Sequence, residues 1–283
     1  MPRTILITGT GTGFGHRAAS FLARRGDTVF ATMREPDGRN KASADRLRSA
    51  ATAEGLPLHV VELDVTSETS VDRAVSAILA KSGGRIDVVI NNAGYGVIGQ
   101  QEAVTPAQAT TMFDTNVIGI LRVNRAVLPA MRAQRSGLII NLSSGLGRLV
   151  IPFLGVYGAT KFAVESLTES LSIELKPFGI DCVAIEPGAY PGTDFNAHIQ
   201  PAADTARVAT YGEHADAPQK LIAAFISSLT TVPDPDEIVH LAAAIIDQPA
   251  GTRKVRYPKG NVAELTAGLN AESERIQAIL AGH

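Results

Sequence analysis

The sequence predicts an α/β protein, in which a doubly wound parallel sheet is covered by helices on both faces. Short apolar runs alternate with amphipathic segments along most of the chain. Runs such as DVVINN at 87–92 are apolar on consecutive residues, which is typical of strands buried on both faces. At 283 residues and 45% hydrophobic, the chain can bury a large core. We therefore expect one domain over 1–283.

Seven strands and seven helices are expected in alternation. The apolar, often β-branched runs predict strands at 3–8, 27–32, 58–63, 86–91, 137–143, 180–186 and 253–257. The amphipathic stretches predict helices near 14–25, 40–54, 67–82, 105–134, 156–176, 235–247 and 261–281. Only 190–235 interrupts this alternation of strands and helices. It carries prolines at 191, 201, 218, 233 and 235 and no clear strand, so it predicts an excursion from the sheet.

Charge and composition limit the partners. Lys and Arg total 26 against 28 Asp and Glu, so the net charge of -2 gives no reason to expect nucleic acid or an anionic membrane. No signal-peptide pattern follows Met1, and no apolar stretch of about 18 residues could span a bilayer. Neither Cys182 nor the six histidines show the spacing of metal ligands. We expect a cytoplasmic protein that binds small molecules and no metal.

The stretch LITGTGTGFGHRAA, residues 6–19, predicts a phosphate-binding loop between the first strand and the first helix. The dinucleotide fingerprint G-x-G-x-x-G does not fit, whereas Gly9, Gly13 and Gly15 fit G-x-x-x-G-x-G. Glycines allow a tight turn and a close approach of the backbone to an anion at a helix N-terminus. By itself the pattern leaves open an ordinary strand-to-helix turn.

Further polar signals follow the ends of the strands, where doubly wound sheets bind their ligands. These ends read TGTGTGFG, ATMR, LDV, NNAG, NLSS and EPG. The segment YGATK then places Tyr157 and Lys161 four residues apart on one helix face, so the ammonium can lie near the phenol.

Taken together, these residues resemble the short-chain dehydrogenase/reductase family over about 3–260. The matching motifs, in the family's order, are Thr8-Gly9-x-x-x-Gly13-x-Gly15, Asp64-Val65, Asn91-Asn92-Ala93-Gly94, Asn116, Ser144, Tyr157-x-x-x-Lys161 and Pro187-Gly188. The resemblance implies a Rossmann-type domain with a seven-stranded parallel sheet, in agreement with the strand count. It also favours Ser144 over the adjacent Ser143, because Ser144 precedes Tyr157 by the family's thirteen residues.

The resemblance implies the catalytic roles. Tyr157 would be the general acid/base, Lys161 would bind the nicotinamide ribose, Ser144 would hydrogen-bond the reacting oxygen, and Asn116 would hold a water in a proton relay. A phenol with a pKa near 10 is a poor base at neutral pH. We therefore expect the ammonium of Lys161 and the oxidised cofactor to lower the pKa of Tyr157.

The resemblance also implies a cofactor site. Asp64 and Val65 would flank the adenine, 91–94 would line the adenosine side, and Pro187-Gly188 with Thr193 would face the nicotinamide. PGAYPGT holds one residue more than the family's P-G-x-x-x-T, so the role of Thr193 stays open. Besides Tyr157 and Lys161, the implied cofactor-binding residues are Gly9, Thr12, Gly13, Phe14, Gly15, Arg34, Asp64, Val65, Asn91, Ala93, Gly94, Pro187, Gly188 and Thr193.

The end of the second strand predicts NADP(H) as the cofactor. An acidic residue about twenty positions after the glycine loop would bind the ribose 2′-OH of NAD, whereas an arginine accommodates the 2′-phosphate of NADP. Here Arg34 follows Gly15 by nineteen residues. Glu35 and Asp37 follow closely, and either could reach a ribose.

The sequence thus predicts an NADP(H)-dependent oxidoreductase that acts on a carbonyl or secondary alcohol. A catalytically silent NADP(H)-binding or sensing protein is the alternative, and a sugar-nucleotide epimerase is a third reading. Segment 190–231, with Phe195, Ile199 and Phe225 among its apolar residues, predicts a lid over a hydrophobic substrate. The apolar helix 156–176, together with 105–134, predicts a homodimer or homotetramer.

Overall fold

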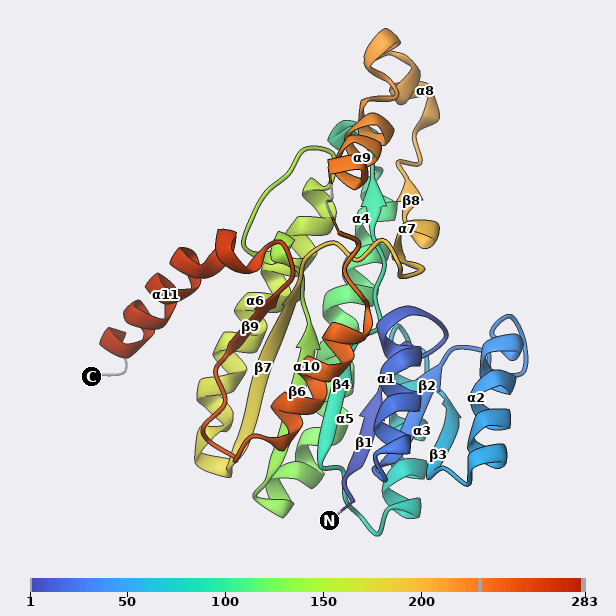
Figure 1. The fold of residues 1–283 in the computed structure, drawn as a ribbon, viewed down its shortest axis with the longest axis vertical. Coiled ribbons are helices and arrows are strands. Elements are labelled where there is room, and N and C mark those ends of the chain that lie inside the picture. Colours follow the sequence, from blue (N-terminus) through green and yellow to red (C-terminus); the bar gives the residue numbers. More distant parts are fainter. Residues whose placement is uncertain (1, 229–230, 281–283) are drawn as a thin grey trace.

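The computed structural model describes residues 2–228 and 231–280, apart from the side chains of 196 and 197. It contains the predicted seven-stranded sheet, in which every pair of neighbouring strands is parallel. From one edge to the other, the order is β3 (Leu58–Glu62), β2 (Thr28–Met33), β1 (Thr4–Ile7), β4 (Val88–Asn91), β6 (Gly137–Leu142), β7 (Ile180–Pro187) and β9 (Arg256–Lys259) (Figure 1). This is a Rossmann-like α/β fold.

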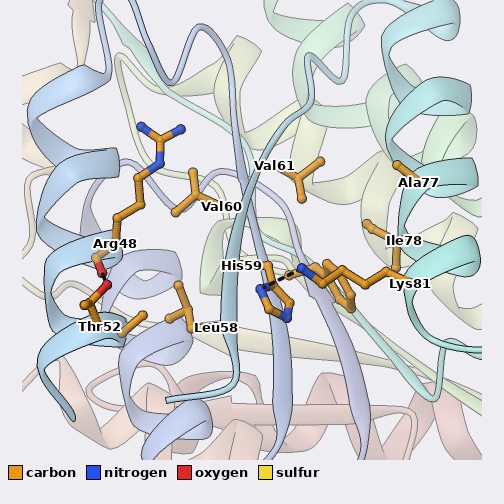
Figure 2. Close-up of a pocket in the computed structure, with 11 residues that line it drawn as sticks. Arg48, Thr52, Leu58, His59, Val60, Val61, Ala77, Ile78 and Lys81 are labelled. Carbon is orange, nitrogen blue, oxygen red and sulfur yellow. Dashed lines mark hydrogen bonds between the residues drawn. The ribbon is translucent and has the colours of Figure 1, made fainter. Parts of the chain in front are cut away.

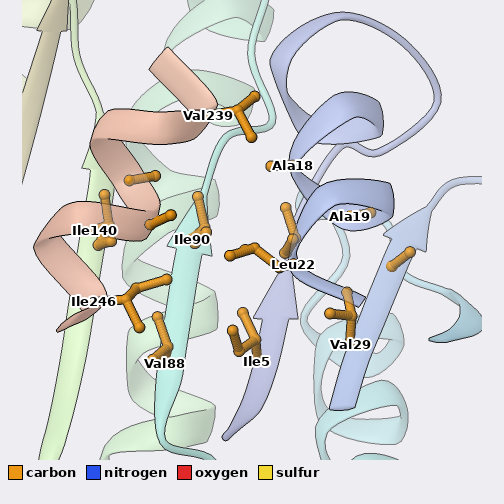
Figure 3. Close-up of a cluster of buried hydrophobic side chains, with 14 of the residues drawn as sticks. Ile5, Ala18, Ala19, Leu22, Val29, Val88, Ile90, Ile140, Val239 and Ile246 are labelled. Atoms are coloured by element: carbon orange, nitrogen blue, oxygen red, sulfur yellow. The ribbon is translucent and has the colours of Figure 1, made fainter. Parts of the chain in front are cut away.

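Helices cover both faces of the sheet. On one face lie α1 (Gly13–Arg24), α2 (Lys41–Glu54) and α10 (Asp236–Asp247), and on the other lie α3 (Glu68–Lys81), α5 (Gly119–Gln134) and α6 (Gly155–Leu175). Figure 3 shows Leu22 of α1 and Ile246 of α10 pointing onto the sheet near Val88 and Ile90. The core is thus two apolar layers on either side of strands that are apolar on consecutive residues.

Two expected elements differ in their bounds. The helix predicted over 105–134 consists of α4 (Pro106–Phe113), a π-helical turn over Asp114–Ile118, and α5. The last strand begins at Arg256 rather than at 253. Arg253 instead holds the turn after α10, because its guanidinium donates to the main-chain oxygens of Ile245, Ile246 and Gln248.

After β7 the chain leaves the sheet, as expected, and forms α7 (Phe195–His198), β8 (Gln200–Pro201), α8 (Thr205–Ala209) and α9 (Ala217–Ser228). The expectation of no strand in this segment was wrong. The two-residue β8 pairs in parallel with β5 (Val97–Ile98), through Gln200 N–H to Gly96 O at 2.9 Å and Ala202 N–H to Ile98 O at 2.9 Å. A strand of two residues is too short to show a period in the sequence.

The described chain closes with α11 (Ala263–Leu280), which follows β9 and extends away from the body of the molecule (Figure 1). Across the described residues, no helix combines the length and the apolar character needed to cross a bilayer.

Candidate active site

The glycine loop lies against the segment that follows β4. Gly9 has a φ of +70°, and a Cβ built on it would lie 2.7 Å from Ala93 Cα. A Cβ on Gly15 would collide with the Asn92 side chain and Gly9 O. Thr8 Oγ1 accepts from the N–H groups of Asn92 and Ala93, at 3.0 and 3.1 Å. Glycine is therefore required at 9 and 15 by close packing of the two loops.

The remaining glycine of the motif faces open space. Gly13 has a φ of +58°, starts α1, and has no atom within 4 Å of where its Cβ would be. Thr12 caps α1 in an extended conformation without a side-chain hydrogen bond. The first N–H groups of a helix lack partners within it and attract anions. These residues fit a phosphate group of a dinucleotide.

Arg34 lies exposed at the end of β2, next to the glycine loop. Among the described residues, its guanidinium has no carboxylate partner within ion-pair distance. The two acidic residues that follow it are engaged elsewhere. Glu35 pairs with Arg39 at 3.3 Å, and Asp37 pairs with Arg48 at 2.9 Å. Arg34 is thus available to a ligand, whereas both nearby carboxylates are paired with other arginines.

The residues predicted on the adenosine side lie after β3 and β4. Asp64 accepts from the N–H and hydroxyl of Thr66, at 2.9 and 2.7 Å, which closes a tight turn. Val65 is buried against Gly119 of α5. Asn91 is directed into the core, where its amide donates to Asn124 and Asn141 at 3.1 and 2.9 Å. Its side chain therefore braces the sheet.

Ser144, Tyr157 and Lys161 come together at the carboxyl end of β6. Ser144 caps the short turn Gly145–Gly147, and its Oγ accepts from Leu146 N–H at 3.1 Å. Lys161 Nζ lies 5.8 Å from the Tyr157 ring centre and donates to Leu142 O at 2.7 Å. The phenol and the ammonium both lie buried on one face of α6.

Burial dominates the ionisation of both groups. Desolvation raises the pKa of Tyr157 to about 12, against the opposing hydrogen bond with Ser144. Desolvation also lowers the pKa of Lys161 to about 8, and the carboxylate of Glu165 opposes this. Within the protein alone, the pKa of Tyr157 is therefore raised, and the expectation that Lys161 would lower it is not met.

Asn116 lies in the π-helical turn, 1% exposed. Its amide donates to Tyr95 O at 2.9 Å and to Thr160 Oγ1 at 3.1 Å, and its Oδ1 accepts from Tyr95 N–H at 3.1 Å. The side chain thus joins the loop after β4 to the helix of Tyr157 and Lys161. Both amide protons are committed, so a bound water would have to use an oxygen of Asn116.

The extra residue in PGAYPGT is accommodated by burying Tyr190, which packs edge-on against Phe14 with ring centres 5.5 Å apart. Thr193 donates its hydroxyl to Tyr190 O at 2.8 Å and so closes this turn. A Cβ on Gly188 would overlap Asn261 Oδ1, which also accepts from Ala189 N–H at 3.1 Å. Asn261, from the C-terminal part of the chain, therefore holds Pro187-Gly188 in place.

Sequence reasoning missed Asn261, Tyr190 and Glu165 as neighbours of the site. A signal existed for Tyr190, which lies in the segment PGAYPGT that is one residue longer than the family's, and for Glu165, an acidic residue one helix turn after Lys161. None marked Asn261. A separate hollow of about 360 Å³ lies on the edge strand β3, where Lys81 Nζ approaches His59 Nδ1 at 3.3 Å (Figure 2). None of the predicted site residues lines it.

The fold and these residues define a class: an α/β protein with a glycine loop between its first strand and first helix and a Tyr–Lys pair at the same edge of the sheet. The family model of short chain dehydrogenases matches residues 3–204. The chain belongs to the short-chain dehydrogenase/reductase family.

Two relatives share the greater part of the chain. A 3-ketodihydrosphingosine reductase of Bacteroides thetaiotaomicron is 39% identical over 195 residues, which are 69% of this chain and 65% of that protein. Retinol dehydrogenase 8 of Bos taurus is 40% identical over 190 residues, 66% of this chain and 59% of its own length. The chain thus covers less than two thirds of either relative.

Two solved structures match this chain over a longer span than the two relatives do. A short-chain dehydrogenase from Streptomyces avermitilis has a TM-score of 0.78 at 28% identity, covering 99% of this chain and 96% of that one. A 3-ketoacyl-(acyl-carrier-protein) reductase from Brucella melitensis, complexed with NADH, has a TM-score of 0.73 at 28% identity, covering 90% and 96%.

Proposed function

We propose that this protein transfers a hydride between NADP(H) and a carbonyl or secondary alcohol, with Tyr157 as the general acid/base. The observation that carries this proposal is the burial of Tyr157 beside Ser144 and Lys161, at the sheet edge that also bears the glycine loop. A protein that only binds the cofactor has no need for a buried phenol hydrogen-bonded to a serine.

In the direction of reduction, the bound nicotinamide would supply a hydride to the carbonyl carbon. Tyr157 would donate its proton to the oxygen as it becomes an alkoxide, and its high pKa keeps that proton available at neutral pH. Ser144 would donate a hydrogen bond to the same oxygen. Lys161 would supply positive charge beside the phenolate that remains and bind the ribose hydroxyls.

A test of this function is the oxidation of NADPH by the purified protein in the presence of ketones, aldehydes, quinones and steroids. We expect substrate-dependent loss of NADPH with at least one class. The silent alternative predicts that NADPH binds and that no carbonyl in the panel is reduced.

We propose that the substrate is hydrophobic. The buried side of Tyr157 packs in an apolar cluster with Val97 and Met112, and Phe195 lies over its ring with centres 5.5 Å apart. The sphingoid reductase among the relatives is named for an amphipathic lipid substrate, which supports the same class. Apolar surroundings favour uncharged substrates, because burying an unpaired charge is costly.

We further propose that 1–283 is one domain and that 190–231 is its substrate lid; residues 1, 229, 230 and 281–283 lie outside the described residues. This segment starts from the nicotinamide-facing loop, and its contacts with the body include the β5–β8 pair and Gln100, whose amide donates to His214 O and Ala215 O at 3.2 and 3.1 Å. Gln108 adds two more, because its amide donates to Pro201 O at 2.8 Å and its Oε1 accepts from Ala203 N–H at 3.0 Å. Opening of the lid would break these polar contacts.

We expect amide hydrogen exchange to be fast in 190–231 without ligands and slower once cofactor and a substrate are bound. The β4 and β6 amides serve as the internal reference, since they lie in the centre of the sheet. Full protection of the segment without ligand, unchanged on binding, would contradict a mobile lid.

A homodimer or homotetramer remains our proposal for the assembly. The outer surfaces of 114–134 and α6 expose large apolar side chains: Ile118 (39%), Leu121 (38%), Phe162 (41%) and Ile173 (56%). Burying such a surface between two copies would remove it from water.

Light scattering at micromolar concentration is expected to give two or four times the chain mass of 29.7 kDa. Phe162→Glu should shift the distribution toward the monomer, because it would place a charge in the buried interface. A wild-type mass near 29.7 kDa would refute the assembly.

A further inference from the structure

A buried ionic cluster lies behind the catalytic helix, built around Arg256 of β9. Arg256 is 3% exposed and donates from Nε to Glu165 Oε2 at 2.9 Å and from a terminal nitrogen to Glu169 Oε2 at 2.7 Å. Its Nε also lies 3.7 Å from Glu186 Oε1. Asn270 of α11 donates to the other oxygen of Glu186 at 2.8 Å.

Glu165 connects this cluster to the catalytic groups. It follows Lys161 by one turn of α6, so both side chains lie on one helix face, and both are buried. A Cβ built on Gly147 would lie 2.9 Å from Glu165 Cγ and 3.0 Å from Lys161 O. Gly147 belongs to the turn that Ser144 caps. The stem of Glu165 thus packs directly beneath the turn of Ser144.

We propose that Glu165, paired with Arg256, is a positioning residue that keeps the ammonium of Lys161 charged and fixed beside Tyr157. The proposal rests on the function proposed above. Glu165 touches neither cofactor nor substrate in this scheme, and it acts through Lys161 and through the turn that carries Ser144.

The electrostatics of Lys161 support this role. Its hydrogen-bond acceptor, Leu142 O, is neutral, while its burial lowers its pKa to about 8. Glu165 is the charged group that opposes the fall. A nearby opposite charge favours the charged form of a base and so opposes the effect of burial. Without the carboxylate of Glu165, the pKa of Lys161 would fall further.

Several other charged groups lie around Glu165. Arg256 faces it from β9, Glu169 follows on α6, and Glu186 and Arg148 lie on the β7 and Ser144 side. Burial and the neighbouring Glu165 raise the pKa of Glu186 to about 7. Arg256, which donates to both Glu165 and Glu169, is the cation that these carboxylates share.

The test compares NADPH affinity, and kcat/KM for carbonyl reduction, across pH in Glu165→Gln and Glu169→Gln. Both changes remove a carboxylate from Arg256, but Glu169 is two turns from Lys161. We expect the alkaline limb near pH 8 in the wild type to move down by at least about one unit in Glu165→Gln only. Glu165→Asp, which keeps the charge, should move it less.

A uniform loss at all pH values, with the limb unmoved, would show that Glu165 is only structural and would overturn the proposal. Should Glu165→Gln fail to fold, Glu165→Asp is measured instead. Its shorter side chain displaces the carboxylate, so its limb should still lie at lower pH than that of Glu169→Gln, and coinciding limbs would overturn the proposal. The proposed function is judged separately, by Tyr157→Phe. An inactive Tyr157→Phe with an unmoved limb in the Glu165 variants removes only the positioning role.

Discussion

Tyr157→Phe is expected to lower turnover by at least 10²- to 10⁴-fold, about the contribution of general acid–base catalysis, while NADPH binds nearly as before. The change removes the hydroxyl and keeps the ring, which packs against Val97 and Met112. Because burial raises the pKa of Tyr157 to about 12, the lost group is a proton donor at neutral pH. Steady-state rates and NADPH fluorescence titrations measure the two quantities.

Tyr257→Phe provides the matched control. Tyr257 lies on β9, and its hydroxyl donates to Gln248 Oε1 at 2.7 Å and accepts from Lys254 N–H at 3.0 Å. Removing this hydroxyl should cost about 1 kcal/mol of stability and leave turnover intact. A Tyr157→Phe enzyme with rates within threefold of wild type would refute the assignment of the acid/base.

Wild-type protein is expected to bind NADPH at least about tenfold more tightly than NADH, a difference of some 1.4 kcal/mol, and Arg34→Ala should erase most of that preference. Arg34 is exposed at the end of β2, and among the described residues it has no carboxylate partner. A guanidinium can bind a phosphate through two charge-assisted hydrogen bonds. Affinity for NADH, which lacks the 2′-phosphate, should change little.

Calorimetric titration of both cofactors decides between the outcomes. Arg24→Ala is the control, because Arg24 is an exposed arginine paired with Glu54 at the far end of α1 from the glycine loop. It should leave the preference unchanged. Equal affinities in the wild type, or a preference that survives Arg34→Ala, would leave Arg34 without a role in discrimination.

The sequence by itself determined the sheet and the order of its elements. Strands buried on both faces are apolar on consecutive residues, so runs such as 87–92 and 137–143 were visible without any knowledge of their neighbours. The glycine spacing and Tyr157-x-x-x-Lys161 were equally local, because one loop and one helix turn contain them. Predicted strands and helices therefore fell close to the observed ones.

Contacts between residues far apart in the chain were decided only by the tertiary structure. Arg256 lies 91 residues from Glu165, and Asn261 lies 72 residues from Ala189, and no period or motif links either pair. The pKa of Tyr157 also followed from packing, since burial outweighed the charge that the spacing of Lys161 suggested. A sequence pattern records which face of an element is apolar, whereas desolvation and long-range pairing depend on what the fold places against that face.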